Sequence, residues 1–184
     1  MYWCQGVRMK HGARIIEFSG ISVKLNRKIV FEKTDWIWRS GQQWVVFGGN
    51  GSGKTLFSQV IMNKIRVFSG DAKYPSFPED SKGIAYVSFE ETRRLYEVDR
   101  KNDDSEYLAS AFDHGTTVKH LILQGQKETR AFYETVRLLN IDHILDQGIR
   151  FLSSGETRKA LIARALCSKP DVIIVDNPFE GLDA

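Results

Sequence analysis

Short apolar runs separated by polar turns fill the first forty residues, and this spacing predicts strands. The turns are Asn26-Arg27-Lys28 and Arg39-Ser40-Gly41, whose residue types reverse a chain. The runs are Ile15–Phe18, Ile21–Leu25, Ile29–Phe31 and Trp36–Trp38. Together they predict a small, largely antiparallel sheet. Trp36 and Trp38 should share one face of a strand, and packing of that face is favoured over a stacking platform for bases.

Longer segments follow in which strands and helices alternate. Continuous apolar runs predict buried strands at Trp44–Phe47, Gly83–Ser88 and Asp171–Asp176. Helical patterns cover Lys54–Arg66, Thr116–Gln124, Lys127–Leu139 and Thr157–Ser168, with a short turn begun by Asp142. Two prolines and several polar residues predict a loop over Gly70–Lys82. This alternation is typical of an α/β fold.

A glycine-rich segment joins the run Trp44–Phe47 to the helix after it. Residues 48–55 fit the phosphate-loop pattern G-x-x-x-x-G-K-[ST]. In such a loop backbone N–H groups surround phosphates, Lys54 reaches the β- and γ-phosphates, and the Thr55 hydroxyl binds Mg²⁺. The alternative is a glycine-rich turn that happens to contain Lys-Thr, which the flanking strand and helix disfavour. The predicted nucleotide-binding residues are Gly48, Asn50, Gly51, Ser52, Gly53, Lys54, Thr55 and Leu56.

Two features near the end of the chain complete the candidate chemistry. Ser153 and Glu156 have the spacing of a capping box at the start of a helix. Asp176 ends the last apolar run, and ligands of open α/β sheets gather at the carboxyl ends of strands. The sequence therefore predicts that Asp176 holds the Mg²⁺ water shell opposite Thr55.

Composition narrows the class of protein. The 184 residues suit one domain, with 42% hydrophobic and 27% charged residues. The net charge is only +3, whereas a nucleic-acid binder is expected to carry a basic stripe. A nucleic-acid partner is therefore not expected. Cys4 and Cys167 lack metal-type spacing and indicate a reducing compartment. No apolar run reaches the ~20 residues of a membrane helix, so direct membrane insertion is not expected.

The order of the motifs resembles that of an ATP-binding cassette (ABC) ATPase. The phosphate loop, Phe89-Glu90, residues 152–156 (LSSGE) and Val175-Asp176-Asn177-Pro178 follow one another as in that family, and Glu180-Gly181-Leu182-Asp183 looks like its D-loop. The resemblance covers residues 15–184. It implies an α/β P-loop NTPase fold of ABC type, with a mainly parallel core sheet, a small antiparallel β-subdomain and a helical subdomain at about residues 91–168.

Finer details resemble the first half of the molybdenum-transport-linked, photorepair-type tandem ABC ATPases (ModF-like). The segments concerned are 87–90 (VSFE), 152–159 (LSSGETRK) and 178–183 (PFEGLD). Such proteins carry two ATPase halves and no membrane segment. The chain holds one phosphate loop, and the resemblance implies an ABC domain that is incomplete after the D-loop. Residues 1–14 are expected to be a disordered or targeting-like extension.

The resemblance also implies cofactors and partners. ATP and Mg²⁺ would bind between the phosphate loop of one unit and the signature residues of a second unit in a head-to-tail dimer. Those signature residues are Ser153, Ser154, Gly155 and Glu156. The second unit would be another ABC ATPase half, in the same full-length chain or in a homodimer, and a membrane transport subunit is a further possible partner. The expected location is the cytoplasm, with the mitochondrial matrix as an alternative.

The sequence departs from the family pattern at four places. Leu25 stands where an aromatic side chain usually stacks on adenine, and Phe89 replaces the Q-loop glutamine, with Glu90 beside it. Ser154 and Glu156 replace a glycine and a glutamine of the signature. Asn177 occupies the position of the catalytic glutamate. Glu90 is a possible substitute, although an ordinary solvated loop carboxylate is the favoured interpretation of Glu90.

These departures leave three hypotheses. The first is an ABC-type ATPase subunit with impaired turnover. The second is an ATP-gated regulatory module that closes on ATP but hydrolyses little, which Asn177 favours. The third is a fragment without a stable fold, because a sheet that lacks its last strands exposes a long edge.

Overall fold

The computed structural model describes residues 12–75, 83–88, 94, 97 and 115–177. The chain divides into two units, residues 1–84 and 85–184. Within the described residues, no helix has the length and apolar character needed to cross a membrane.

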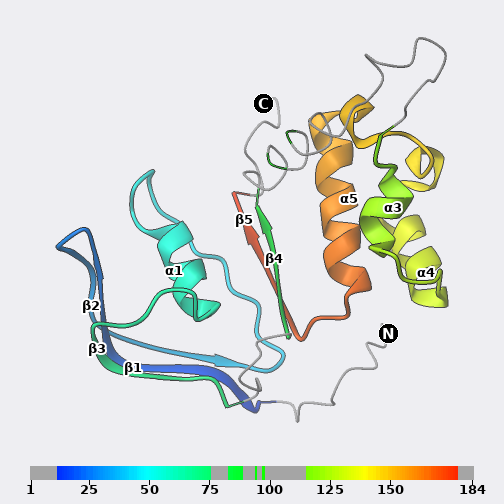
Figure 1. Ribbon diagram of the computed structural model, residues 1–184. Helices are drawn as coiled ribbons and strands as arrows, with labels where there is room; N and C mark the ends of the chain where they lie inside the picture. The colour runs from blue at the N-terminus through cyan, green and yellow to red at the C-terminus, as the bar shows by residue number, and fades with distance from the viewer. Residues whose placement is uncertain (1–11, 76–82, 89–93, 95–96, 98–114, 178–184) are drawn as a thin grey trace. The chain divides into compact units, whose positions relative to one another are not determined.

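The first unit is built on a three-stranded antiparallel sheet (Figure 1). Strand β1 (Arg14–Leu25) lies between β2 (Lys28–Arg39) and β3 (Ser69–Lys73). The predicted turn between β1 and β2 is confirmed, because Asn26 and Arg27 have positive φ angles of 47° and 69°, as a tight hairpin turn requires. The four predicted runs therefore form two long strands.

A bulge explains why the sequence pattern of β1 looked interrupted. The register between β1 and β2 shifts between Phe18 and Ile21, around Gly20, whose φ is +57°. The Gly20 N–H donates to Asp35 Oδ1 at 2.6 Å. An extra residue in one strand breaks the alternation of side chains without ending the strand.

Aromatic side chains form the packed face of this sheet. The Trp36 ring lies 5.6 Å from the Phe18 ring and 5.1 Å from the Phe57 ring. The rings of Trp36 and Trp38 are 5.6 Å apart, which confirms that they share a face. The face therefore packs against helix α1 (Lys54–Ile61), which carries Phe57.

Helix α1 is shorter than predicted, since it ends at Ile61 and not at Arg66. Asn63 adopts a left-handed conformation with φ +55°, and the Lys64 N–H donates to Gln59 O at 2.9 Å. This is the bonding pattern that commonly closes a helix.

The predicted strand Trp44–Phe47 is wrong for the structure. Residues 43–49 belong to no strand, and Val45 and Phe47 are 89% and 97% exposed. A strand needs neighbouring backbone for its N–H and C=O groups, and within the first unit this segment has no strand partner. Its apolar composition alone does not make it a strand.

The predicted loop Gly70–Lys82 is also wrong at its start, because Ser69–Lys73 forms strand β3 on the free edge of β1. Strands β3 and β1 approach closely at Gly70, where a Cβ atom would lie 2.3 Å from Gly20 O. The φ of Gly70 is +85°. The strand is thus specified by its neighbour and by a glycine, and not by an apolar pattern.

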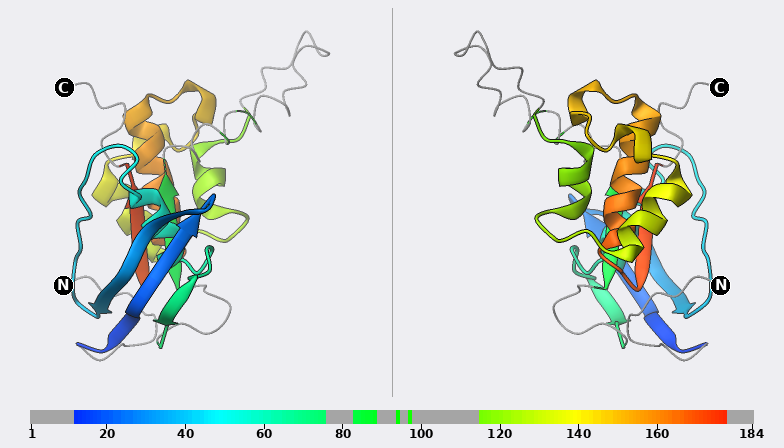
Figure 2. Two further views of the ribbon diagram at one scale, coloured as in Figure 1. Left: turned by 90° about the vertical axis from the view of Figure 1, so that its left-hand side faces the viewer. Right: turned by 90° about the vertical axis from the view of Figure 1, so that its right-hand side faces the viewer.

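The second unit combines two strands with helices packed on them (Figures 1 and 2). Strand β4 (Ile84–Ser88), which begins at the unit boundary, pairs with β5 (Val172–Asp176). Helix α5 lies between this pair and helices α3 and α4 (Figure 1). The remaining elements are α3 (Val118–Leu123), α4 (Arg130–Leu139), α5 (Ser154–Cys167), and the 3₁₀ turns η1 (Asp142–Ile144) and η2 (Ile149–Phe151).

One continuous apolar core joins these elements. Val87 of β4, Phe132 of α4 and Leu161 of α5 belong to it, each 5% exposed or less. The predictions of β4, β5, these helices and the turn at Asp142 are confirmed within a few residues. The full burial predicted for β5 is wrong, because Val175 is 41% exposed.

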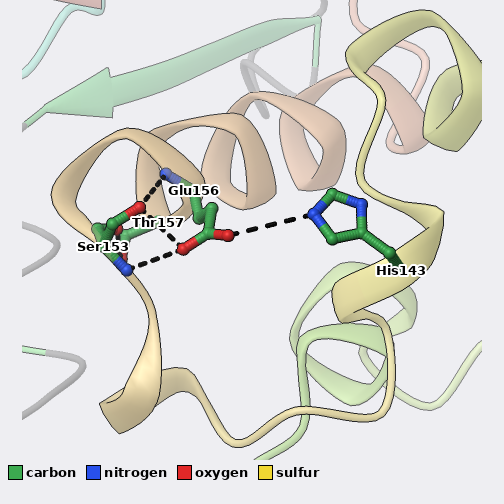
Figure 3. A network of polar contacts seen from close by, with 4 residues as sticks. All are labelled: His143, Ser153, Glu156 and Thr157. Atoms are coloured by element: carbon green, nitrogen blue, oxygen red, sulfur yellow. Dashed lines mark hydrogen bonds and ion pairs between the residues drawn. The ribbon is translucent and has the colours of Figure 1, made fainter.

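The predicted capping box at the start of α5 is confirmed (Figure 3). The Ser153 hydroxyl accepts from the Glu156 N–H at 3.3 Å, while the Ser153 N–H donates to Glu156 Oε2 at 2.8 Å. The Ser153 hydroxyl also donates to that carboxylate at 2.6 Å. These hydrogen bonds from Ser153 lower the pKa of the Glu156 carboxyl.

We expect Gly70→Ala to destabilise the first unit more than Gly12→Ala does. Both glycines have a positive φ, +85° and +82°, which costs an alanine about 1–2 kcal/mol. A Cβ at Gly12 would meet nothing within 4 Å, whereas one at Gly70 collides with backbone, which adds about 1–3 kcal/mol. Urea unfolding followed by tryptophan fluorescence measures both variants. Equal effects would contradict the close approach of β3 to β1.

We expect Ser153→Ala to cost about 1 kcal/mol at pH 7 and less below pH ~4. The folded-state pKa of Glu156 is lowered, so its contribution is complete above the unfolded pKa and is lost as the pH falls through the folded pKa. Thr129→Ala is the control. Thr129 caps α4 in the same way, but the residue three positions later is Phe132, which has no carboxylate to titrate. Urea unfolding at pH 7 and ~3.5 provides the comparison. A Ser153→Ala penalty that does not change with pH contradicts the coupling.

Candidate functional site

The predicted phosphate loop forms a tight turn that leads into α1. Gly51 and Gly53 have φ angles of +78° and +95°, a region that side chains rarely adopt. The Ser52 N–H donates to Gly49 O at 3.2 Å, and Gly53 is the N-cap residue of α1 without a side-chain capping bond. The first N–H groups of α1 therefore have no capping side chain to which they donate.

The two glycines that frame the loop differ in how closely other atoms approach them. A Cβ on Gly48 would lie 2.7 Å from Ser52 Oγ. A Cβ on Gly53 would lie 3.0 Å from Val30 Cγ1 and 3.1 Å from Phe31 Cζ. Since Gly53 also has a positive φ, both space and backbone conformation require glycine there.

The Lys54 side chain folds back over the loop. Its ammonium group donates to Gly48 O at 2.8 Å and to Gly49 O at 2.9 Å. A cation at this place, beside the N-terminus of α1, suits an anion such as a phosphate.

The other predicted loop residues differ in exposure. Asn50, Gly51, Ser52 and Thr55 are exposed. Leu56 is only 7% exposed and packs in the core, so its side chain is not accessible to a ligand. Leu25, at the position of the adenine-stacking aromatic, ends β1 with 48% exposure.

The signature residues occupy the first turn of α5 in the second unit (Figure 3). Glu156 Oε1 lies 3.9 Å from His143 Nε2 on η1, a contact that sequence reasoning missed. Thr157 Oγ1 donates to Ser153 O at 2.9 Å. Ser153 and Glu156 are thus held by each other, and Gly155 has open space around its Cα.

A second contact that sequence reasoning missed involves the carboxylate of Asp176, the last residue of β5. The Tyr86 hydroxyl, on β4, donates to Asp176 Oδ2 at 2.8 Å. Tyr86 lies in an apolar run that reads as core, so no sequence signal distinguishes it. Asn177, which follows, has a φ of +50°.

The chemistry of the predicted ligands fits Mg²⁺. Asp176 offers a carboxylate and Thr55 a hydroxyl, and Mg²⁺ prefers such oxygen ligands with several waters retained. Thr55 belongs to the first unit and Asp176 to the second. No cluster of three or more His, Cys, Asp or Glu side chains occurs in the described ranges.

Several predicted site residues lie outside the described residues. They are Phe89, Glu90 and the D-loop segment 180–183. Cys4 lies there too, whereas burial raises the pKa of the Cys167 thiol, in keeping with an unreactive cysteine.

Curated proteins similar in sequence to this chain include ATP-binding proteins of transporters. ModF, an ABC transporter ATP-binding protein of Escherichia coli K12, is 30% identical over 145 residues, which are 78% of this chain and 29% of ModF. ZnuC, a zinc import ATP-binding protein of Vibrio vulnificus YJ016, is 26% identical over 92% of this chain and 57% of its own length. The chain thus spans less than two thirds of either relative. Neither match supports the mitochondrial alternative.

Solved structures show the same fold. The structure of cbiO1 from Clostridium perfringens, described as part of the ABC transporter complex cbiONQ, has a TM-score of 0.69 at 19% identity. The match covers 93% of this chain and 68% of that one. The predicted α/β fold of the P-loop NTPase class is therefore confirmed.

A match to a protein-family model shows to which family the chain belongs. The model described as "ABC transporter" matches residues 31–180, which is most of the chain and includes the phosphate loop, the signature and Asp176. The chain therefore belongs to the ABC transporter family of ATP-binding domains.

Proposed function

We propose that the chain is an ATP-binding subunit of ABC type that binds Mg·ATP and pairs head-to-tail with a second ATPase half. The observation that carries this proposal is the phosphate loop. Positive φ angles at Gly51 and Gly53 turn the backbone, and Lys54 lies over the loop carbonyls at 2.8 and 2.9 Å. When a nucleotide binds, the Lys54 ammonium group would donate to the β- and γ-phosphates in place of these carbonyls.

Thr55 and Asp176 are the proposed ligands of Mg²⁺ and its water shell. Bound Mg²⁺ would neutralise the charge that develops on the phosphate oxygens. The part played by this chain is to present the Thr55 hydroxyl in the first turn of α1 and the Asp176 carboxylate at the end of β5.

The proposed contact with a second ATPase half uses Ser153, Ser154 and Gly155 at the start of α5. A helix N-terminus attracts an anion, which favours a γ-phosphate held by the partner, whereas the Glu156 carboxylate in the same turn opposes it. The partner is another ATPase half, within a longer chain or as a second copy, and a transport subunit is a further proposed partner. No cargo is assigned, since a fold does not transmit a substrate.

A second candidate function is an ATP-gated regulatory module with little hydrolysis. Asn177 favours it, because an amide does not accept a proton from water at neutral pH as a glutamate would. The side chains of Phe89 and Glu90, which would also contribute to turnover, lie outside the described residues. Binding of ATP is common to both candidates, whereas the rate of hydrolysis separates them.

The first test measures nucleotide binding to the full chain by calorimetry. Since Leu25 offers no aromatic face to a base, we expect ATP and GTP to bind within about tenfold of each other, a difference of ~1.4 kcal/mol. Lys54→Ala should abolish both. Lys73→Ala is the matched control, because it removes an exposed lysine of the same unit. Strong preference for ATP, or unchanged affinity in Lys54→Ala, would contradict the proposal.

The second test concerns Asn177 and uses single-turnover hydrolysis. Loss of a positioned base costs about 10²–10⁴-fold, so we expect slow wild-type hydrolysis and faster hydrolysis in Asn177→Glu and Asn177→Asp. Aspartate is included because it tolerates positive φ angles better than glutamate does.

The control for this test is Asn140→Asp, which makes the same change at φ +51° at the end of α4. Glu90→Ala tests whether the base has moved. If Glu90→Ala removes the activity and Asn177→Glu leaves it unchanged, Glu90 is the base and the ATPase hypothesis holds. Rapid wild-type hydrolysis that neither change affects would refute the argument from Asn177.

A further inference from the structure

The side chain of Tyr86 touches the one carboxylate proposed to serve Mg²⁺ in the second unit. Tyr86 stands in the middle of β4, and Asp176 is the last residue of the adjacent strand β5. The Tyr86 hydroxyl donates to Asp176 Oδ2 at 2.8 Å. Both residues are half-buried, so the hydrogen bond lies at least partly away from competing water.

A hydrogen bond to an ionised acceptor is stronger and more orienting than one between neutral groups. A carboxylate can turn about its Cβ–Cγ bond and exchange its two oxygens. Because Oδ2 accepts from Tyr86, rotation of the carboxylate would break that hydrogen bond. Oδ1 takes no part in the bond to Tyr86. Partners of this kind behind a metal ligand fix its orientation and its basicity.

We propose that Tyr86 is a positioning residue for the divalent cation that accompanies the nucleotide. Its hydroxyl holds the Asp176 carboxylate so that Oδ1 serves the cation or its water shell. This inference rests on the proposed function, because it requires Asp176 to act on Mg²⁺.

A purely structural role for the same bond is the competing explanation. The Tyr86–Asp176 bond would then tie β4 to β5 and stabilise the unit without affecting the cation. The two strands already pair through their backbones, so the side-chain bond is not needed to align them. The two explanations differ in what they predict for Mg²⁺, since a tie between strands acts equally on nucleotide binding with and without the cation.

The experiment compares ATP binding with excess Mg²⁺ and with EDTA on the full chain, by calorimetry. The quantity of interest is the ratio of the two dissociation constants within one sample. If part of the sample is unfolded, both apparent dissociation constants rise by the same factor, so their ratio does not depend on the folded fraction. Tyr86→Phe removes one oxygen atom and retains the ring.

We expect Tyr86→Phe to lower the Mg²⁺-dependent gain in ATP affinity by about tenfold, the lower end of the effect of losing a partner behind a metal ligand. Affinity in EDTA should stay unchanged. Asp176→Asn should lose at least as much of the gain, and the double variant should lose no more than Asp176→Asn alone, because Tyr86 acts through Asp176.

Tyr133→Phe is the matched control. Tyr133 also donates its hydroxyl to a carboxylate, that of Glu128, but at the start of α4. We expect its ratio to equal that of the wild type.

The outcomes separate this inference from the function on which it rests. If wild type binds ATP without any gain from Mg²⁺, the proposed metal site falls and the inference falls with it. If wild type shows the gain and Tyr86→Phe retains it in full, the metal site stands and the role of Tyr86 is refuted. An additive loss in the double variant would also refute it, since Tyr86 would then act independently of Asp176.

Discussion

The unpaired N–H groups at the start of a helix are the constraint on which both candidate binding regions depend. The first turn of any helix leaves such groups without intrahelical partners. Helix α1 begins at Gly53 without a side-chain cap, while α5 begins with the reciprocal bonds of Ser153 and Glu156. The two helices therefore differ, because α1 has no side-chain cap, whereas the start of α5 is satisfied by its own residues.

This difference affects what each helix can bind. At α1 the positive end of the dipole and the Lys54 ammonium would both attract an anion. At α5 the Glu156 carboxylate already sits at the positive end, and its bonds to Ser153 hold its pKa below the usual value. A phosphate that approaches α5 meets a negative charge, where the family pattern has a neutral glutamine. The proposed pairing with a second ATPase half through this signature would have to overcome a repulsion that the family pattern lacks.

Local features of the fold could be predicted from the sequence, and features that depend on distant partners could not. The hairpin turn at Asn26 and the capping box at Ser153 follow from a few adjacent residues, and both are confirmed. Residues 44–47 have the composition of a strand, but a strand exists only where other backbone pairs with it. Residues 69–73 have no apolar pattern, yet they pair with β1 because Gly70 permits close approach.

The candidate site shows the same division. The spacing within residues 48–55 sufficed to predict a turn around Gly51 and Gly53, since the motif is contiguous. The bond from Tyr86 to Asp176 joins residues 90 positions apart, and no local pattern marks it. Contacts of this kind are set by which strands become neighbours.

Asn177 combines a backbone preference with a chemical one, and their magnitudes can be compared. Its φ of +50° lies in a region that asparagine tolerates and that costs most other residues about 1–2 kcal/mol. A positioned general base is worth about 10²–10⁴-fold in rate, or roughly 3–5 kcal/mol. If rapid hydrolysis were required of this position, the gain from a glutamate would exceed its backbone strain. The left-handed conformation alone therefore does not account for asparagine at this position.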